Sequence, residues 1–317
     1  QQGTDLLTDS THVFQAPTAY LMEQGTHLGA HTGGQAVFEG ENEPDGAMLT
    51  YSVVKPDTRE IEGTPPEEAT IRVTNASGDT IRTIHGPADD GLNRTTWGLR
   101  REGVRDPGTP KEEMEEDEQP AGPTVSPGTY TAHISYRGHI DSTMVQVRPD
   151  PRTDGVTPEE REARQAMYDR LMSRIETATE AADRLRKAKK IIEQVNGQLE
   201  GRDDSTAMQA RERGMALADS VDALLHEILP KDYEEGIRSD PTIVDARLGT
   251  VGFYLGTEDD GPDETERIAL ERAEHRLRVA LDEVNAFFDT EWPEYRQAVE
   301  QANPSFFEEY APIRMEE

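Results

Sequence analysis

The sequence contains no cysteine among its 317 residues. This absence excludes a disulfide framework, a thiolate zinc site and a cysteine nucleophile, although it does not fix the compartment. No stretch approaches the roughly 18 apolar residues of a membrane span, and the start of the chain has no basic-then-apolar leader. We therefore expect no membrane insertion. Because the sequence begins at Gln1 without Met, it is interpreted as either a processed chain or a piece of a longer one.

Lysine is also scarce, since the sequence has 6 lysines against 27 arginines. Together with 64 acidic residues, this composition gives a net charge of −31. Such a balance excludes an ordinary nucleic-acid binder, which needs a basic footprint to displace phosphate counterions. Residues 1–150 hold 25 acidic and 11 basic side chains, and residues 151–317 hold 39 and 22. The charge is thus a property of the whole surface, and two interpretations stay open: adaptation to concentrated salt, or an acidic function such as cation binding.

The first half of the chain has the pattern of short β-strands separated by turns. Six or seven such strands in about 110 residues are typical of an antiparallel sandwich. Turn residues such as Asp45-Gly46, Asn75–Asp79 and Arg137-Gly138 separate them. The predicted strands are Ala36–Phe38, Ala47–Val53, Thr70–Thr74, Thr80–Ile84, Asn93–Leu99, Thr129–Tyr136 and Thr143–Val147.

An acidic segment interrupts this pattern. Residues 101–127 include the run Glu112–Glu118, flanked by prolines, which cannot bury enough apolar surface to form a strand. We predict a solvated loop here, with a cation site as the alternative. Residues 1–34 are rich in Gly and Thr and are predicted to be an arm or an edge strand.

From Asp150 onward the pattern becomes helical. Thr157-Pro158-Glu159-Glu160 combines an N-cap, a first-turn proline and a capping box, and it predicts a helix of about 40 residues. Further helices are predicted at about Ser205–Ile228, at Thr242–Leu255 and from about Pro262, with an interruption at Trp292-Pro293. The apolar face of the second helix is predicted to hold Met208, Met215, Ala218, Val221, Leu225 and Ile228. That of the last long helix is predicted to hold Ile268, Leu270, Leu277, Leu281, Val284, Phe287 and Phe288. Three long amphipathic helices with short connections predict an antiparallel bundle.

Catalytic and metal-binding templates find no convincing match. The sequence has no Gly-x-Ser-x-Gly elbow, no Gly-Lys pair of a P-loop and no His-Glu-x-x-His helix motif. His226 and His275 lie on predicted helices and are interpreted as boundary or surface residues rather than metal ligands. His27 and His31 have helical spacing, but neighbouring glycines disfavour a helix there.

The loop Gly256–Glu266 superficially resembles a calcium-binding loop. Aligning Gly261 with the invariant glycine places Gly256 at the first ligand position and Arg267 at the last, so both ligands are lost. Trp97, in a predicted strand, is expected to pack in the core rather than stack on a sugar.

Five spaced motifs carry a family resemblance, and they are Val13–Tyr20, Phe38–Ala47, Gly91–Arg100, Pro127–Thr131 and Asp150–Arg152. Together they resemble the region after the β-propeller in bacterial sortilin-like, BNR-repeat (Asp-box) proteins, which are often described as glycosyl hydrolases. In that family an Ig-like domain, similar to that of flagellar hook-capping proteins, follows the propeller and precedes a helical segment.

The resemblance covers only the part beyond the propeller. An Asp-box needs Ser/Thr-x-Asp-x-Gly followed by Trp, and the nearest match, Thr257-x-Asp259-x-Gly261, lacks the aromatic residue. The resemblance therefore implies a non-catalytic accessory or interaction module of a secreted or periplasmic protein. Its expected partners are the β-propeller of the same parent protein, another protein, or a second copy through the helices.

These observations predict an α+β, multidomain chain. It comprises an arm at 1–34, an antiparallel Ig-like β-sandwich at 35–150 with the acidic loop 101–127, and a bundle of three long helices plus short ones at 151–317. We assign no catalytic, cofactor-binding or metal-binding residues. Two alternatives stay open: a glycoside hydrolase-related protein acting through paired carboxylates, and a carbohydrate- or peptide-binding module.

Overall fold

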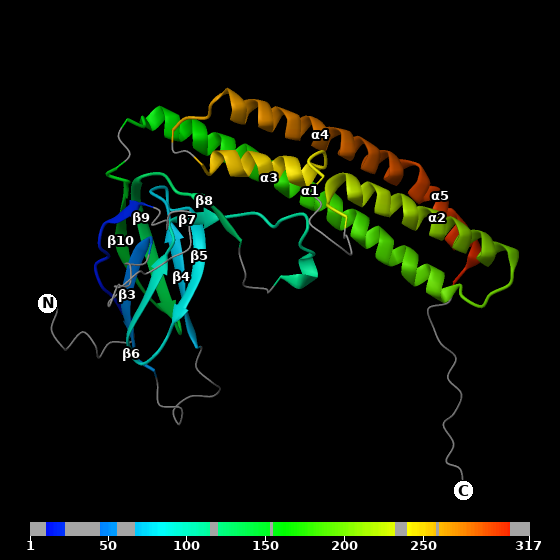
Figure 1. The fold of residues 1–317 in the computed structure, drawn as a ribbon. Helices are drawn as coiled ribbons and strands as arrows, with labels where there is room; N and C mark the ends of the chain where they lie inside the picture. Colours follow the sequence, from blue (N-terminus) through cyan, green and yellow to red (C-terminus); the bar gives the residue numbers. More distant parts are fainter. Residues whose placement is uncertain are drawn as a thin grey trace, which may run out of the picture. The chain divides into compact units, whose positions relative to one another are not determined.

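The computed structural model describes residues 11–22, 45–55, 67–114, 120–152, 155–231, 240–257 and 260–304 (Figure 1). The chain divides into two compact units. The β unit comprises residues 1–104 and 119–161, and the helical unit comprises residues 105–118 and 162–317. The chain thus contains both antiparallel sheets and helices, as an α+β chain should. The predicted strand Ala36–Phe38 and the pair His27 and His31 lie outside the described residues.

The β unit contains two larger sheets and one two-stranded ribbon. In the first sheet the order is β1-β3-β6, and in the second it is β2-β10-β9-β4-β5, with β7 and β8 pairing separately. All pairs are antiparallel except β2 with β10. The strands are β1 (Thr11–Val13), β2 (Ala19–Leu21), β3 (Ala47–Val53), β4 (Glu68–Thr74), β5 (Thr80–Pro87), β6 (Gly91–Trp97), β7 (Arg100–Glu102), β8 (Ala121–Thr124), β9 (Gly128–Tyr136) and β10 (His139–Pro149).

One buried apolar cluster receives side chains from both larger sheets. Leu49 and Tyr51 of β3 and Ile71 of β4 are fully buried, because alternate residues of a strand point to the same face. The turn Arg137-Gly138 has positive φ at both residues, 50° and 84°, which is the geometry that joins adjacent antiparallel strands in two residues. Strand register is therefore fixed both by burial and by turn chemistry.

The motif residues of this unit have structural roles. Trp97 is 1% exposed, and its Nε1 donates to the Arg100 carbonyl at 2.9 Å. Its ring meets that of Tyr130 edge-on, with centroids 5.3 Å apart. The Tyr130 hydroxyl donates to the carbonyl of Ser126, four residues earlier, at 2.7 Å. The expectation that Trp97 packs in the core is confirmed.

Two further motif positions shape turns. The buried Asn93 side chain donates to the Asp89 carbonyl at 2.7 Å and accepts from the Asp89 amide at 2.9 Å, which closes the turn before β6. Gly46 has φ +109°, and a Cβ there would collide with the Trp97 carbonyl oxygen. Only glycine fits this close approach of the two strands.

The prediction of one solvated loop at 101–127 is wrong in two respects. Its ends form the ribbon of β7 and β8, paired through Arg100 with Thr124 and Glu102 with Ala121. Its middle belongs to the helical unit and includes the short 3-10 helix η2 (Lys111–Glu113). Composition alone suggested solvation, but specific polar side chains on a helix hold part of the segment in place. Residues 115–118 of the acidic run lie outside the described residues.

The helical unit contains α1 (Pro158–Gln198), α2 (Ser205–Ile228), α3 (Val244–Leu255), α4 (Glu264–Asp289) and α5 (Glu291–Ala302). The predicted capping box begins α1, because the Thr157 hydroxyl accepts from the Glu160 amide at 3.2 Å and Glu160 accepts from the Thr157 amide at 2.8 Å. At α2 the Asp204 side chain accepts from the Ala207 amide without a reciprocal bond, and Asp263 and Glu266 form a further capping box at α4. The 41 residues of α1 span about 60 Å.

The four shorter helices lie along α1 in two rows (Figure 1). One row is α2 followed by α3, and the other is α4 followed by α5. Between the two rows, α3 packs against α4, and α2 packs against α5. A single apolar cluster of described residues runs through all five helices, and Leu185 and Ile192 of α1 are fully buried in it. No described helix is long and apolar enough to cross a membrane.

The predicted apolar face of α2 is wrong at its two methionines. Met208 and Met215 are 51% and 57% exposed, whereas the small residues Ala207, Ala210 and Gly214 are buried. A Cβ on Gly214 would lie 3.0 Å from the Tyr295 hydroxyl of α5. Close approach of the helices selects small residues over large apolar ones.

On α4 the apolar face is narrower than predicted. Ile268 is 38% exposed, whereas Leu270, Leu277 and Val284 are buried.

Candidate functional site

A basic cavity opens on the helical unit beside α3 and α4. Its volume is about 480 Å³, and its lining residues are Arg247, Glu271, Arg272, His275 and Arg276. Three arginines and one carboxylate give the lining a positive charge, although the chain as a whole carries −31. This reversal of sign makes the cavity the candidate functional site.

Helix periodicity brings these side chains together. Arg272 and Arg276, four residues apart on α4, share one side of that helix, as do Glu271 and His275. Arg247 comes from the second turn of α3, which packs against α4. The cavity is therefore formed by two helices whose relative position is set by the apolar cluster beneath them.

Arg276 is held firmly in place. Its Nε donates to the Thr242 carbonyl at 3.0 Å, and its guanidinium forms an ion pair with Glu227 at the end of α2. In contrast, no hydrogen bond or ion pair joins the guanidinium of Arg247 or Arg272 to any residue that the structure describes. Within the part of the chain that the structure describes, Arg247 and Arg272 thus have no such partner, while Arg276 is fixed beside them.

Nearby carboxylates offset part of this charge, because Glu227 forms an ion pair with Arg276 and the charge of Asp240 interacts with that of Arg247. Glu274, which neighbours His275 in the sequence, binds Arg170 and Arg174 of α1, with Nε to Oε1 distances of 2.6 and 2.9 Å. The hydrogen bond from Arg170 is the largest cause of the lowered pKa of Glu274. Asp240 accepts from the Thr242 amide and hydroxyl, which lowers its pKa, and the charge of Arg247 adds to this effect.

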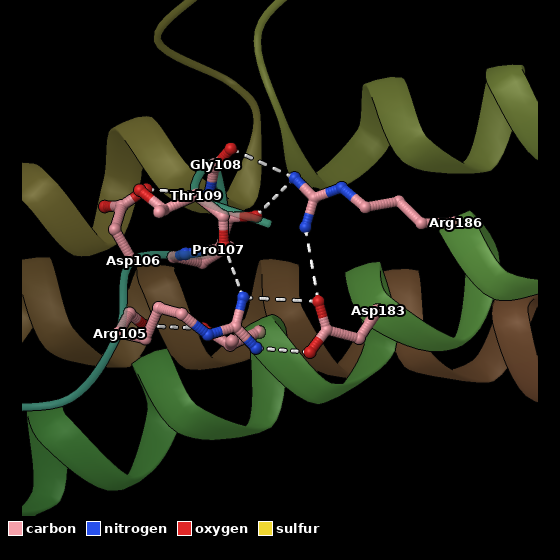
Figure 2. A network of polar contacts seen from close by, with 8 residues as sticks. Arg105, Asp106, Pro107, Gly108, Thr109, Asp183 and Arg186 are labelled. Atoms are coloured by element: carbon pink, nitrogen blue, oxygen red, sulfur yellow. Dashed lines mark hydrogen bonds and ion pairs between the residues drawn. The ribbon is translucent and has the colours of Figure 1, made fainter. Parts of the chain in front are cut away.

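A second polar cluster holds residues 105–114, here called the clasp, against α1 (Figure 2). The Arg105 guanidinium forms an ion pair with Asp183, and the Arg105 carbonyl accepts from the Thr179 hydroxyl at 2.8 Å. Arg186 donates to the carbonyls of Pro107 and Gly108 at 2.7 and 3.1 Å. Because the partners on α1 are three or four residues apart, they form one polar stripe that matches the turn of the clasp.

The clasp changes the electrostatics of α3. Burial raises the pKa of Asp245, and the negative charge of Asp106 in the clasp raises it further. The clasp is interpreted as a structural fastening rather than a binding site, because its charged groups already have partners.

The residues that were weighed as metal ligands in the sequence lie in different parts of the structure. His226 is half-buried on α2 and does not line the cavity, whereas His275 is exposed and does. Of the loop 256–266, Asp263 caps α4 and Glu266 is buried beside Arg164 of α1. Among the described residues, no three His, Asp or Glu side chains are arranged to hold a metal ion.

Sequence reasoning missed the cavity. The available signal was a cluster of cationic residues in an acidic chain, since residues 267–278 contain four arginines and a histidine. Comparison with known proteins adds nothing here, because no family model and no curated protein matches this chain.

Proposed function

We propose that this chain is a non-catalytic accessory module that stabilises a β-propeller of the same parent protein or mediates assembly with another protein. In this proposal the β unit is an Ig-like sandwich, the helical unit is an antiparallel bundle, and the parent protein is extracellular or periplasmic. The observation that carries it is the structural use of the motif residues. Asn93, Trp97 and Tyr130 are engaged in contacts within the β unit.

The Tyr130 to Ser126 hydrogen bond supports the Ig-like assignment. Near the start of β9, a tyrosine hydroxyl returns to a backbone carbonyl four residues upstream, as in the tyrosine corner of Ig-like domains. The strand order supports the Ig-like assignment less strongly, because β2 pairs with β10 in parallel rather than antiparallel.

A hydrolase with paired carboxylates finds less support. Such an enzyme needs two carboxyl groups roughly 5–10 Å apart across a cleft. The cavity on the helical unit is lined by one carboxylate, Glu271, among three arginines. A module that stacks sugars on tryptophan is also disfavoured, since Trp97 is buried and Trp292 packs among Phe287, Phe288 and Tyr295.

The accessory role is tested in two parts. The purified chain should hydrolyse no member of a panel of aryl glycosides, and adding it to the propeller encoded with it should raise the melting temperature of that propeller. Hydrolysis that disappears on replacing one carboxylate, such as Glu271→Gln, would show that the chain is an enzyme. An unchanged melting temperature, together with no co-elution from a sizing column, would remove the accessory role.

A second copy of the chain is the other proposed partner. Met208 and Met215 lie seven residues apart on the exposed side of α2, where they offer an apolar stripe for self-association. We expect weak association at low salt and stronger association at high salt, because salt screens repulsion between two chains of charge −31. Light scattering across a salt series measures this, and a monomer at every salt concentration contradicts it.

A further inference from the structure

The cavity on α3 and α4 has features that specify the chemistry of its ligand. This inference rests on the proposed role as an interaction module and concerns the partner that such a module recognises. The guanidiniums of Arg247 and Arg272 have no hydrogen-bond or ion-pair partner within the described residues. A planar guanidinium presents paired N–H donors that match the two oxygens of a carboxylate.

Glu271 narrows the choice of anion. A carboxylate in the lining repels a dianion such as phosphate more strongly than a monoanion, because the Coulomb energy grows with the ligand's charge. The same carboxylate accepts hydrogen bonds and so favours a ligand that carries an N–H donor near its negative group. A peptide with an acidic side chain supplies both groups, since each residue other than proline carries a backbone N–H.

Apolar side chains extend the same surface. Tyr254 lies seven residues after Arg247 on α3, and Ile268 lies four residues before Arg272 on α4, so each shares a helix face with a cavity arginine. Their exposed fractions are 36% and 38%. A ligand that reaches beyond the cavity therefore meets apolar as well as cationic groups.

We propose that this cavity binds an acidic side chain of a partner polypeptide, in a segment that also carries apolar residues. Arg247 and Arg272 hold the carboxylate, Arg276 forms a fixed part of the wall through its contacts with Glu227 and Thr242, and Glu271 accepts a backbone N–H of the segment. The chain's overall charge of −31 repels such a partner at long range. Recognition consequently depends on contact in the cavity rather than on electrostatic steering.

Isothermal titration calorimetry with defined peptides tests the proposal. The probe is an acetylated and amidated peptide with three Glu-Leu repeats, compared with the same peptide containing Gln in place of Glu. Titrations in 0.15 M and 1 M salt, where the Debye length falls from about 8 to about 3 Å, separate contact in the cavity from long-range repulsion. The Glu peptide should bind the unaltered protein, and the Gln peptide should bind at least tenfold more weakly in both salts.

Variants locate the site. Arg272→Gln and Arg247→Gln should each weaken the Glu peptide at least tenfold. The matched control is Arg278→Gln, an exposed arginine on α4 that does not line the cavity, and it should leave the affinity within twofold. One of these two variants is sufficient for the test, provided that its far-ultraviolet circular dichroism spectrum matches that of the unaltered protein. The second variant serves if the first does not fold.

Several outcomes would overturn the proposal. They are no binding of the Glu peptide, equal binding of the two peptides, equal loss in the Arg278→Gln control, or tighter binding of inorganic phosphate than of the Glu peptide. Each leaves the accessory role itself intact, because hydrolysis and propeller stabilisation are measured without any peptide.

Discussion

Arg164→Met tests how the helical unit depends on one buried ion pair. Arg164 of α1 is 8% exposed and donates to the carbonyl of Leu255, the last residue of α3, and to that of Asp260, which follows α3. Its Nη2 lies 3.6 Å from Oε1 of Glu266, which is 6% exposed, and 3.7 Å from Oδ1 of Asp260. This single guanidinium therefore connects α1 to the end of α3 and to the start of α4.

We predict that Arg164→Met lowers the free energy of unfolding of the helical unit by about 3–5 kcal/mol. Methionine fills much of the space, so the loss comes from the charge of Glu266, which stays buried with the Asp263 amide as a donor but without a cationic partner, and from the freed carbonyl of Asp260. Glu266→Gln should cost only about 1 kcal/mol, because glutamine preserves the capping box with Asp263. The double variant should be more stable than Arg164→Met alone, since no unpaired charge remains buried.

Urea unfolding followed by circular dichroism at 222 nm measures these differences, because the signal at this wavelength comes mainly from the helices. At about 2–4 °C per kcal/mol for a unit of this size, Arg164→Met should also lower the melting temperature by roughly 6–20 °C. A loss below about 1 kcal/mol, or a double variant with strictly additive losses, would refute the reasoning.

Three further substitutions probe other features. Gly46→Ala should destabilise the β unit by about 2 kcal/mol or more, measured by urea unfolding, because φ is +109° and the new Cβ meets the Trp97 carbonyl. Asp245→Asn should raise the melting temperature at pH 7: burial and the charge of Asp106 raise the pKa of this carboxyl, so its ionisation disfavours the folded state. The gain should disappear as the pH falls below about 4, where the carboxyl is protonated in the unfolded chain too. Met208→Gln should change the unfolding free energy by no more than about 0.5 kcal/mol, because Met208 is half exposed.

Local signals in the sequence predicted much of the secondary structure. The capping residue Thr157 placed the start of α1, because a cap depends only on residues within one helical turn. The turn Arg137-Gly138 likewise separated β9 from β10. Such features follow from backbone geometry alone and need no knowledge of distant contacts.

Features that depend on distant partners were missed. The buried side of α2 faces Asn196 of α1 and Tyr295 of α5, whose side-chain atoms lie 2.5 and 3.0 Å from a Cβ placed on Gly214, and Met208 is left half exposed. The short strands β7 and β8 pair across an intervening segment of the helical unit, so neither has a strong pattern of its own. The cavity brings Arg247 of α3 close to Arg272 of α4. This proximity depends on how the two helices pack, which the sequence alone does not specify.

The clasp has a consequence for dividing the chain into fragments. Because residues 105–118 belong to the helical unit, that unit is discontinuous in sequence. A fragment that begins at residue 162 would expose the Thr179, Asp183 and Arg186 stripe without its partner. A synthetic peptide of residues 105–114 should bind back to such a fragment and restore part of its stability, as happens when a missing segment complements an incomplete protein.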